Sequence, residues 1–137
     1  MVEQVVALLH QLVAFPTVSR TPNREVLGWL MERLEPLGAT VRVVEGAHPG
    51  RANLIASIGP RGAGGVLLSG HTDVVPPGDG WDSDPWSLTR RGDRLVGRGA
   101  ADMKGFFAAT VHALAELPMT TLTAPVHLIA SYDEEIG

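Results

Sequence analysis

Hydrophobic residues recur along the chain with two alternating spacings, which predict helices and strands in turn. Over about residues 2–14 they fall three and four apart, so that one side of a helix is apolar. A second helix is predicted from about residue 22 to near Pro36 and Gly38. Pro22, which follows Thr21, is suited to the first turn of this helix. Its apolar positions are Val26, Leu27, Leu30, Leu34 and Leu37.

Short apolar runs between Gly and Pro clusters predict four strands, at 40–45, 53–58, 66–72 and 125–132. Between the last two we expect a loop over 76–86, a hairpin turning at Gly92 and Asp93, and a helix over 103–117. Strands interleaved with helices are typical of an α/β fold. We therefore predict a mixed, partly parallel sheet with helices on both faces.

Composition narrows the class of protein. The chain has 137 residues, 45% of them hydrophobic, which is enough for the core of one domain. Its 11 basic and 15 acidic residues give a net charge of −4, and the only basic doublet is Arg90 with Arg91, which argues against a nucleic-acid partner. No apolar run approaches the length of a membrane span, and without cysteine there is no thiolate metal site. We expect a cytoplasmic protein that binds no membrane.

Three polar clusters stand at strand ends and at the start of the third helix. They read SGHTDVVP at 69–76, GRGAADMKG at 97–105 and SYDEEIG at 131–137. If the strands that carry the first and third clusters are parallel, the helix between them is the crossover, and all three clusters meet at the carboxyl edge of the sheet. Ligand sites in open α/β sheets lie at that edge. The clusters are therefore expected to build one site.

The residue types in these clusters fit two divalent metal ions about 3.5 to 4 Å apart. His71 offers an imidazole nitrogen, and Asp73, two residues on, can hold the ring as a supporting carboxylate. Asp102 has two oxygens and could bridge the ions, while Glu135 would bind the second one. Glu134 would then be free to take a proton from the water between the metals. We thus predict metal ligands in His71, Asp102 and Glu135, and catalytic roles for Asp73 and Glu134.

Charge crowding at this edge also favours a metal. The clusters gather five carboxylates, and we expect only Lys104 and Arg98 as basic residues nearby. Like charges at such density are unfavourable unless a cation neutralises them. Taken singly, each cluster has an ordinary reading as a polar strand end or a solvated turn. Together they favour a metal-dependent hydrolase.

The three clusters, in this order and spacing, resemble those of the dinuclear zinc amidohydrolases and peptidases. That family includes acetylornithine deacetylases, succinyl-diaminopimelate desuccinylases and aminoacylases. Within it, FPTVSR at 15–20, DMKGF at 102–106 and Tyr132 are most similar to the acetylornithine deacetylases. The resemblance implies two zinc ions, with cobalt as a substitute, and the roles given above for His71, Asp73, Asp102, Glu134 and Glu135. It also implies a cis peptide bond after the bridging aspartate, between Asp102 and Met103.

The activity implied by the resemblance is removal of the acetyl group from N-acetyl-L-ornithine by a metal-activated water, a step of arginine biosynthesis. The small-molecule substrate would be an N-acyl amino acid. One alternative is a relative that acts on another N-acyl amino acid or a dipeptide, such as a desuccinylase or an aminoacylase. A second alternative is a catalytically inactive fragment.

The resemblance covers only the first part of the family's catalytic domain. In the family, a further acidic ligand, a lid domain that forms the homodimer and a late histidine follow the region matched by residues 1–137. We therefore expect residues 1–137 to be the amino-terminal part of the catalytic domain, with one face or edge of the sheet left open. Each ion would have two protein ligands here, whereas catalytic zinc normally has three.

The other candidate side chains are expected to be structural. Lone histidines are weak evidence for a site, and we assign surface or structural roles to His10, His48, His112 and His127. Trp81 and Trp86 are expected to pin the 76–86 loop to the core.

Overall fold

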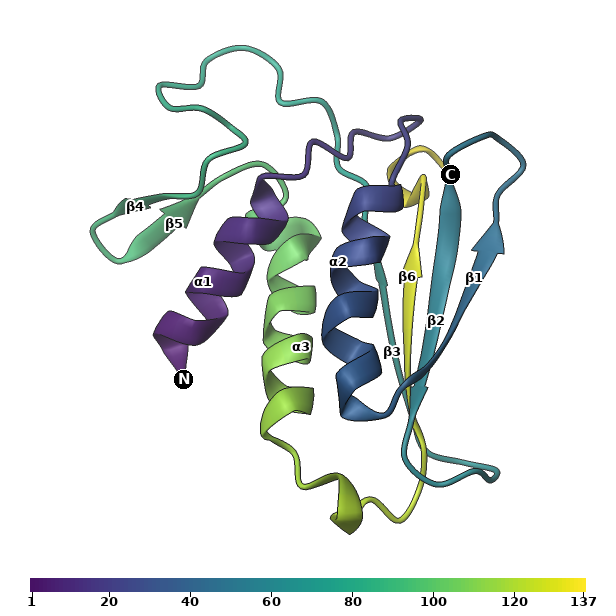
Figure 1. The fold of residues 1–137 in the computed structure, drawn as a ribbon. Helices are drawn as coiled ribbons and strands as arrows, with labels where there is room; N and C mark the ends of the chain where they lie inside the picture. Colours follow the sequence, from purple (N-terminus) through teal and green to yellow (C-terminus); the bar gives the residue numbers. More distant parts are fainter.

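The computed structural model describes residues 1–137, and its helices and strands follow the predicted order (Figure 1). The α-helices and strands lie at Val2–Val13 (α1), Arg24–Leu34 (α2), Gly105–Glu116 (α3), Thr40–Glu45 (β1), Ala52–Ile58 (β2), Val66–His71 (β3), Thr89–Arg91 (β4), Arg94–Val96 (β5) and Val126–Ser131 (β6). Short helical turns lie at Glu35–Leu37 (η1), Ala100–Lys104 (η2), Met119–Thr121 (η3) and Glu134–Ile136 (η4). No helix has the length and apolar character needed to cross a membrane.

The main sheet is mixed, as predicted. Its strand order is β1-β2-β6-β3, and β6 is antiparallel to β2 but parallel to β3. In the parallel pair Val66 lies opposite Val126, and His71 lies opposite Ser131. Both strands therefore end at the same edge of the sheet. The second sheet is the β4–β5 hairpin, which turns at Gly92 and Asp93 where the sequence predicted it.

The second helix begins later than predicted. It starts at Arg24, and the N-cap is Asn23, so Pro22 precedes the helix instead of lying in its first turn. The Asn23 side chain is held elsewhere: its Nδ2 donates to the Ala52 carbonyl at 2.9 Å, and its Oδ1 accepts from the Ala52 backbone N–H at 3.0 Å. These two bonds fasten the start of α2 to the start of β2.

The core lies between one face of the sheet and the three α-helices. Every second residue of β2 is buried, as expected for a strand with one face on a core. The helices contribute the larger buried side chains, among them Leu12 of α1, Leu30 of α2 and Phe107 of α3. The predicted apolar stripe of α1 is buried at Leu9, Leu12 and Val13, whereas Val2, at the free end of the helix, is exposed.

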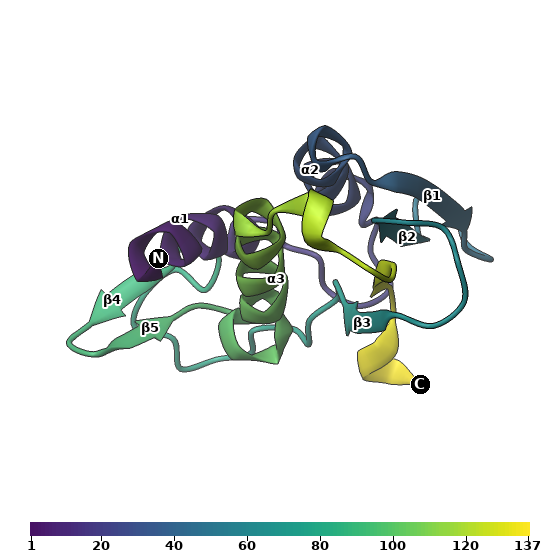
Figure 2. The ribbon, with the colours of Figure 1, turned by 90° about the horizontal axis from the view of Figure 1, so that it is seen from below.

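Helices were expected on both faces of the sheet, and in residues 1–137 they lie on one face. Figures 1 and 2 show α1, α2 and α3 on one side of the sheet and no helix covering the other. The side chains of the edge strand β3 alternate between the two faces: Leu68 packs against the core, whereas Leu67 points to the open face and is 60% exposed. The expectation of an open sheet face with apolar residues in solvent is confirmed.

Candidate metal centre

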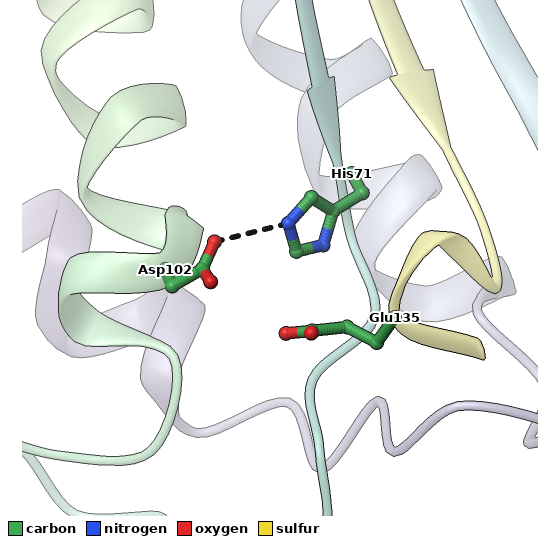
Figure 3. A group of neighbouring side chains, drawn as sticks. All are labelled: His71, Asp102 and Glu135. Atoms are coloured by element: carbon green, nitrogen blue, oxygen red, sulfur yellow. Dashed lines mark hydrogen bonds and ion pairs between the residues drawn. The ribbon is translucent and has the colours of Figure 1, made fainter. Parts of the chain in front are cut away.

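The chemistry-bearing residues converge at the carboxyl edge of β3 and β6. His71 is the last residue of β3, Asp102 lies in the turn η2 before α3, and Glu134 and Glu135 begin η4, just after β6. Figure 3 shows the side chains of His71, Asp102 and Glu135 directed toward one common space. Because β3 and β6 are parallel and α3 connects them, the topology alone brings these residues to one edge.

Three potential ligand atoms lie close enough to share one ion. One ligand atom each from His71, Asp102 and Glu135 lies within 4.8 Å of the other two. His71 is buried, Glu135 is half-buried and Asp102 is exposed, so the group has one buried side and one open side. An imidazole nitrogen with two carboxylate oxygens is a donor set that zinc accepts. The residues present therefore fit a divalent metal ion.

The His71 ring lies closer to the backbone carbonyl of Asp73 than to the Asp73 carboxylate, which was predicted to hold it. The ring Nδ1 lies 2.9 Å from the backbone carbonyl oxygen of Asp73, while the nearer carboxylate oxygen of Asp73 is 3.5 Å away. A carbonyl oxygen only accepts hydrogen bonds, so Nδ1 carries the proton. The lone pair of the neutral ring is then on Nε2, the atom that lies 3.1 Å from Oδ1 of Asp102. The ring therefore presents Nε2 as its ligand atom.

Two side chains of the site, His71 and Glu135, have raised pKa values. Burial lowers the pKa of His71, but the hydrogen bonds to Asp73 and Asp102 and the nearby carboxylate charges outweigh it and leave the pKa raised. The pKa of Glu135 is also raised, first by burial and then by the negative charge of Asp102, an effect that His71 partly opposes. A cation is thus favoured between the ring and the carboxylates.

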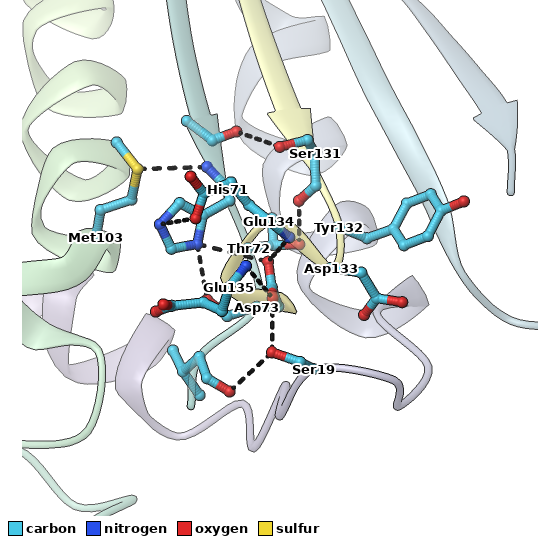
Figure 4. Close-up of polar contacts among 12 residues, drawn as sticks. Ser19, His71, Thr72, Asp73, Met103, Ser131, Tyr132, Asp133, Glu134 and Glu135 are labelled. Carbon is cyan, nitrogen blue, oxygen red and sulfur yellow. Dashed lines mark hydrogen bonds and ion pairs between the residues drawn. The ribbon is translucent and has the colours of Figure 1, made fainter. Parts of the chain in front are cut away.

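The Asp73 carboxylate accepts hydrogen bonds from the acidic turn, which is formed by Glu134 and Glu135. Its Oδ1 accepts the backbone N–H of Glu134 at 3.0 Å, and its Oδ2 accepts that of Glu135 at 3.2 Å and the hydroxyl of Ser19 at 2.7 Å (Figure 4). Asp73 is 3% exposed, so these donors replace water around a buried charge. Sequence reasoning did not single out Ser19, because its partner is 54 positions away and only the fold shows the contact.

Glu134 faces the same space from η4. Its Oε2 lies 3.6 Å from Nε2 of His71, and its side chain is 60% exposed. No hydrogen bond occupies this carboxylate. It is therefore within reach of a molecule that binds between His71 and Asp102, and it can take up a proton there.

The expectation that Lys104 and Arg98 are the only basic residues near the acidic cluster is wrong, because Arg51 lies there too. Lys104 donates to the carbonyl of Phe15, and Arg98 donates to the carbonyl of Pro77, so neither is paired with the acidic cluster. Arg51 instead forms an ion pair with Asp133, and the two side chains are 11% and 14% exposed. No local pattern in the sequence indicates this pair, whose members are 82 residues apart.

The turn that carries Asp102 is tightly built. Gly99 has a left-handed φ of 75°, and its carbonyl accepts the Lys104 backbone N–H at 2.8 Å. The helix proper begins at Gly105, two residues later than predicted, because Asp102 and Met103 have non-helical backbone angles. The peptide bond between Asp102 and Met103 is cis, as the resemblance implied.

A pocket of about 230 Å³ adjoins the site. Asp102 and Glu135 form part of its wall, and Arg98 and Val75 also line it. Trp81 lies beside this region with Arg98 5.4 Å from its ring centre, and its indole N–H donates to the Pro77 carbonyl. The bond to Pro77 lies within the 76–86 loop, and the contact with Arg98 joins the loop to the segment before η2.

The remaining histidines are outside the ligand group. His127 is paired with Ser57, at 2.8 Å between its Nδ1 and the serine hydroxyl, on the strands β6 and β2. The group of residues that could hold an ion includes neither it nor His10, His48 or His112.

Comparisons with known proteins agree with this geometry. The proteins described as peptidase family M20/M25/M40 match the chain over residues 67–137. Acetylornithine deacetylase of Photorhabdus laumondii is 39% identical over 95% of the chain, and that of Proteus mirabilis is 40% identical over 95%. The chain spans 36% and 35% of the lengths of these two relatives.

Solved structures show the same fold. Human carnosine dipeptidase 1 superimposes with a TM-score of 0.84 at 28% identity, covering 98% of this chain and 33% of that one. An M20 family metallo-carboxypeptidase from Sulfolobus solfataricus gives a TM-score of 0.81 at 29% identity, covering 97% of this chain and 31% of that one. Mixed α/β architecture with a partly parallel sheet is therefore the fold of this chain.

Proposed function

The chain belongs to peptidase family M20/M25/M40, and we propose from this that its edge site serves the hydrolysis of an amide bond in an N-acyl amino acid. The preferred substrate is N-acetyl-L-ornithine, because the two curated relatives with about 40% identity are named acetylornithine deacetylases. The observation that carries the proposal is the convergence of His71, Asp102 and Glu135, with Glu134 beside them. Residues 1–137 are proposed to be the amino-terminal part of the catalytic domain.

Two zinc ions are the proposed cofactors, with cobalt as a substitute. His71 and Asp102 would hold one ion, and Asp102 and Glu135 the other, with Asp102 between them. When bound, divalent ions polarise the acyl carbonyl and lower the pKa of water at the site. His71 supports this assignment, because its Nδ1 is fixed by the Asp73 carbonyl and its Nε2 is left to bind.

Glu134 is the proposed general base. Its carboxylate lies on the open side of the site and is 3.6 Å from His71 Nε2. The water oxygen bonds to the acyl carbon while Glu134 accepts a proton of that water. Glu134 then gives the proton to the amide nitrogen as the C–N bond breaks, which yields a carboxylate and an amine. Asp73 holds the backbone N–H groups of Glu134 and Glu135 and thereby orients both side chains.

The reaction is tested by incubating the chain with zinc and N-acetyl-L-ornithine and measuring the release of ornithine. We expect Glu134→Gln to lower the rate by about 10²- to 10⁴-fold while zinc binding persists, since the residue is a base and not a ligand. Glu116→Gln, the same change at an exposed glutamate of α3, is the matched control and should keep the wild-type rate. Equal rates for Glu134→Gln and wild type would refute the assigned base.

A dipeptide is the second candidate substrate. The human carnosine dipeptidase has the highest TM-score quoted above, 0.84, which favours a test of dipeptides alongside N-acyl amino acids. Faster release of amino acids from a dipeptide than from N-acetyl-L-ornithine would replace the preferred substrate. Zinc binding without turnover of either class would favour the inactive-fragment alternative.

A further inference from the structure

The buried carboxylate of Asp73 is surrounded by donors from two distant parts of the chain. Glu134 and Glu135 contribute backbone N–H groups from η4, and Ser19 contributes its hydroxyl from the segment that follows α1. The Ser19 contact is the shortest of the three, at 2.7 Å. Figure 4 shows Ser19 on the side of Asp73 away from His71. The hydroxyl therefore supports the carboxylate from behind the site.

Ser19 is itself held by strand-like pairing. Its backbone N–H donates to the Val74 carbonyl at 3.0 Å, and the Val74 N–H donates to the Thr17 carbonyl at 3.0 Å. Val18 and Val74 form a parallel bridge, so residues 17–19 run alongside the continuation of β3. This pairing fixes the position of the serine backbone relative to Asp73.

The hydroxyl proton has two acceptors within reach, and charge decides between them. Oδ2 of Asp73 lies at 2.7 Å and the Val74 carbonyl at 3.4 Å. A bond to a carboxylate is shorter and about twice as strong as a bond between neutral groups. The proton of Ser19 is therefore directed to Asp73. Without it, Oδ2 would keep only the N–H of Glu135 in a site that water scarcely enters.

These contacts link the segment after α1 to the two functional glutamates. Asp73 fixes the N–H groups of both residues, and their side chains reach the space beside His71 and Asp102. We propose that Ser19 is a positioning residue for the acidic turn, acting through Asp73 on Glu134 and Glu135. Its effect on metal affinity rests on the proposed function, whereas its effect on the turn does not.

The first measurement uses the 137-residue chain without metal. Amide hydrogen exchange by NMR at Glu134 and Glu135 is compared in wild type, Ser19→Ala and Ser19→Thr. We expect Ser19→Ala to speed exchange at both amides by about tenfold and Ser19→Thr, which keeps a hydroxyl, to restore the wild-type rates. Thr21→Ala is the matched control, because that hydroxyl lies in the same segment but donates to the Val18 carbonyl.

The second measurement is the affinity of the same variants for Zn²⁺. Ser19→Ala should weaken zinc binding by about tenfold, at the low end of what changes around metal ligands cause, and Ser19→Thr should restore it. Thr21→Ala should bind as wild type does.

Three results would overturn the inference. One is exchange at Glu134 and Glu135 within twofold of wild type in Ser19→Ala. Another is equal acceleration at core amides such as Leu128, which would show a loss of global stability only. The third is unchanged zinc affinity in Ser19→Ala. If the wild-type chain binds no zinc while the exchange pattern is as expected, the proposed metal function fails and the positioning of the turn by Ser19 stands.

Discussion

Lys104 is the only lysine of the chain, and it is 1% exposed. Its ammonium group donates to the Phe15 carbonyl at 2.5 Å and lies 5.7 Å from the centre of the Trp86 ring. One side chain thus connects the end of α1, the 76–86 loop and the turn that carries Asp102. Burial disfavours the charged form and lowers the pKa of Lys104 to about 8.

This burial predicts a stability that rises with pH in alkaline solution. An unfolded lysine keeps its proton to about pH 10.4, so between pH 8 and that value the unfolded chain binds a proton that the folded chain has lost. The free energy of unfolding should therefore increase across this window by up to about 3 kcal/mol and stay unaffected by Lys104 below it. Chemical denaturation from pH 7 to 10 measures the rise, which Lys104→Met should lack.

A direct check is the NMR titration of the lysine side chain, which gives one signal because the chain has one lysine. A midpoint near 8 agrees with the burial of Lys104. A midpoint above 10 would show that the hydrogen bond to Phe15 and the Trp86 ring offset burial.

At the scale of single residues, the sequence identified side chains by type but not by contact. His71, Asp102 and Glu135 could be selected because ligand-type residues recur at strand ends, and the structure brings them together. The supporting contacts of Ser19 and Arg51 could not be selected, since each joins segments more than 50 residues apart. The ring of His71 is held by a backbone carbonyl, and no residue type in a sequence predicts such a bond.

At the scale of the elements, the conformation of the turn η2 requires a glycine at position 99. Gly99 has φ 75°, and a Cβ added there would lie 2.5 Å from Cγ1 of Val74, which is itself 1% exposed. Gly78 also has a left-handed φ, 69°, but a Cβ there would meet no atom within 4 Å. Substitution of these two glycines therefore distinguishes the cost of a left-handed backbone, which both share, from the cost of a steric clash, which arises only at Gly99.

We expect Gly99→Ala to destabilise the chain more than Gly78→Ala. The left-handed backbone should cost about 1 to 2 kcal/mol at either position. At Gly99 the clash with buried Val74 should add about 1 to 3 kcal/mol, because the surrounding core has little room to move. Urea denaturation of both variants measures the difference. Equal losses would mean that η2 shifts freely, and that the position of Asp102 is not fixed by this packing.

Sequence periodicity predicted the elements well and their layering less well. The hairpin at Gly92 and the parallel pairing of β3 with β6 follow from local patterns and chain direction. The coverage of the sheet does not, because β3 has apolar residues on both faces and a pattern cannot tell which neighbour covers each face. The start of α2 was misplaced because Asn23 bonds to β2, which is remote in sequence.

At the scale of the whole molecule, the main exposed apolar surface lies at the uncovered side of the sheet. Val66 and Leu67 of β3 are 54% and 60% exposed, and β3 is an edge strand with pairing on one side only. An apolar groove of about 400 Å³ runs between β3 and α3, lined by Leu68, Phe106 and Leu117 among others. Open edges and apolar patches favour association with other chains.

We expect the isolated chain to self-associate and Leu67→Lys to reduce that association without lowering stability. A charge on an open edge strand opposes pairing with another edge, and the exposed position needs no repacking. Sedimentation velocity over a range of concentrations measures the effect. Val2→Lys, which places the same charge at an exposed apolar residue of α1, is the control and should leave association unchanged. A clean monomer in the wild type would contradict the expectation.

His71, Asp102 and Glu135 are proposed to hold divalent metal ions at the carboxyl edge of the sheet. Anomalous diffraction at the zinc absorption edge, from crystals of the chain grown with zinc, tests this proposal most directly. Two peaks are expected, one about 2.0 to 2.2 Å from Nε2 of His71 and a carboxylate oxygen of Asp102, and one at the same distance from carboxylate oxygens of Asp102 and Glu135. Crystals of His71→Ala should lack the first peak. Zinc bound only at other histidines, or no peak at this edge of the sheet, would contradict the proposal.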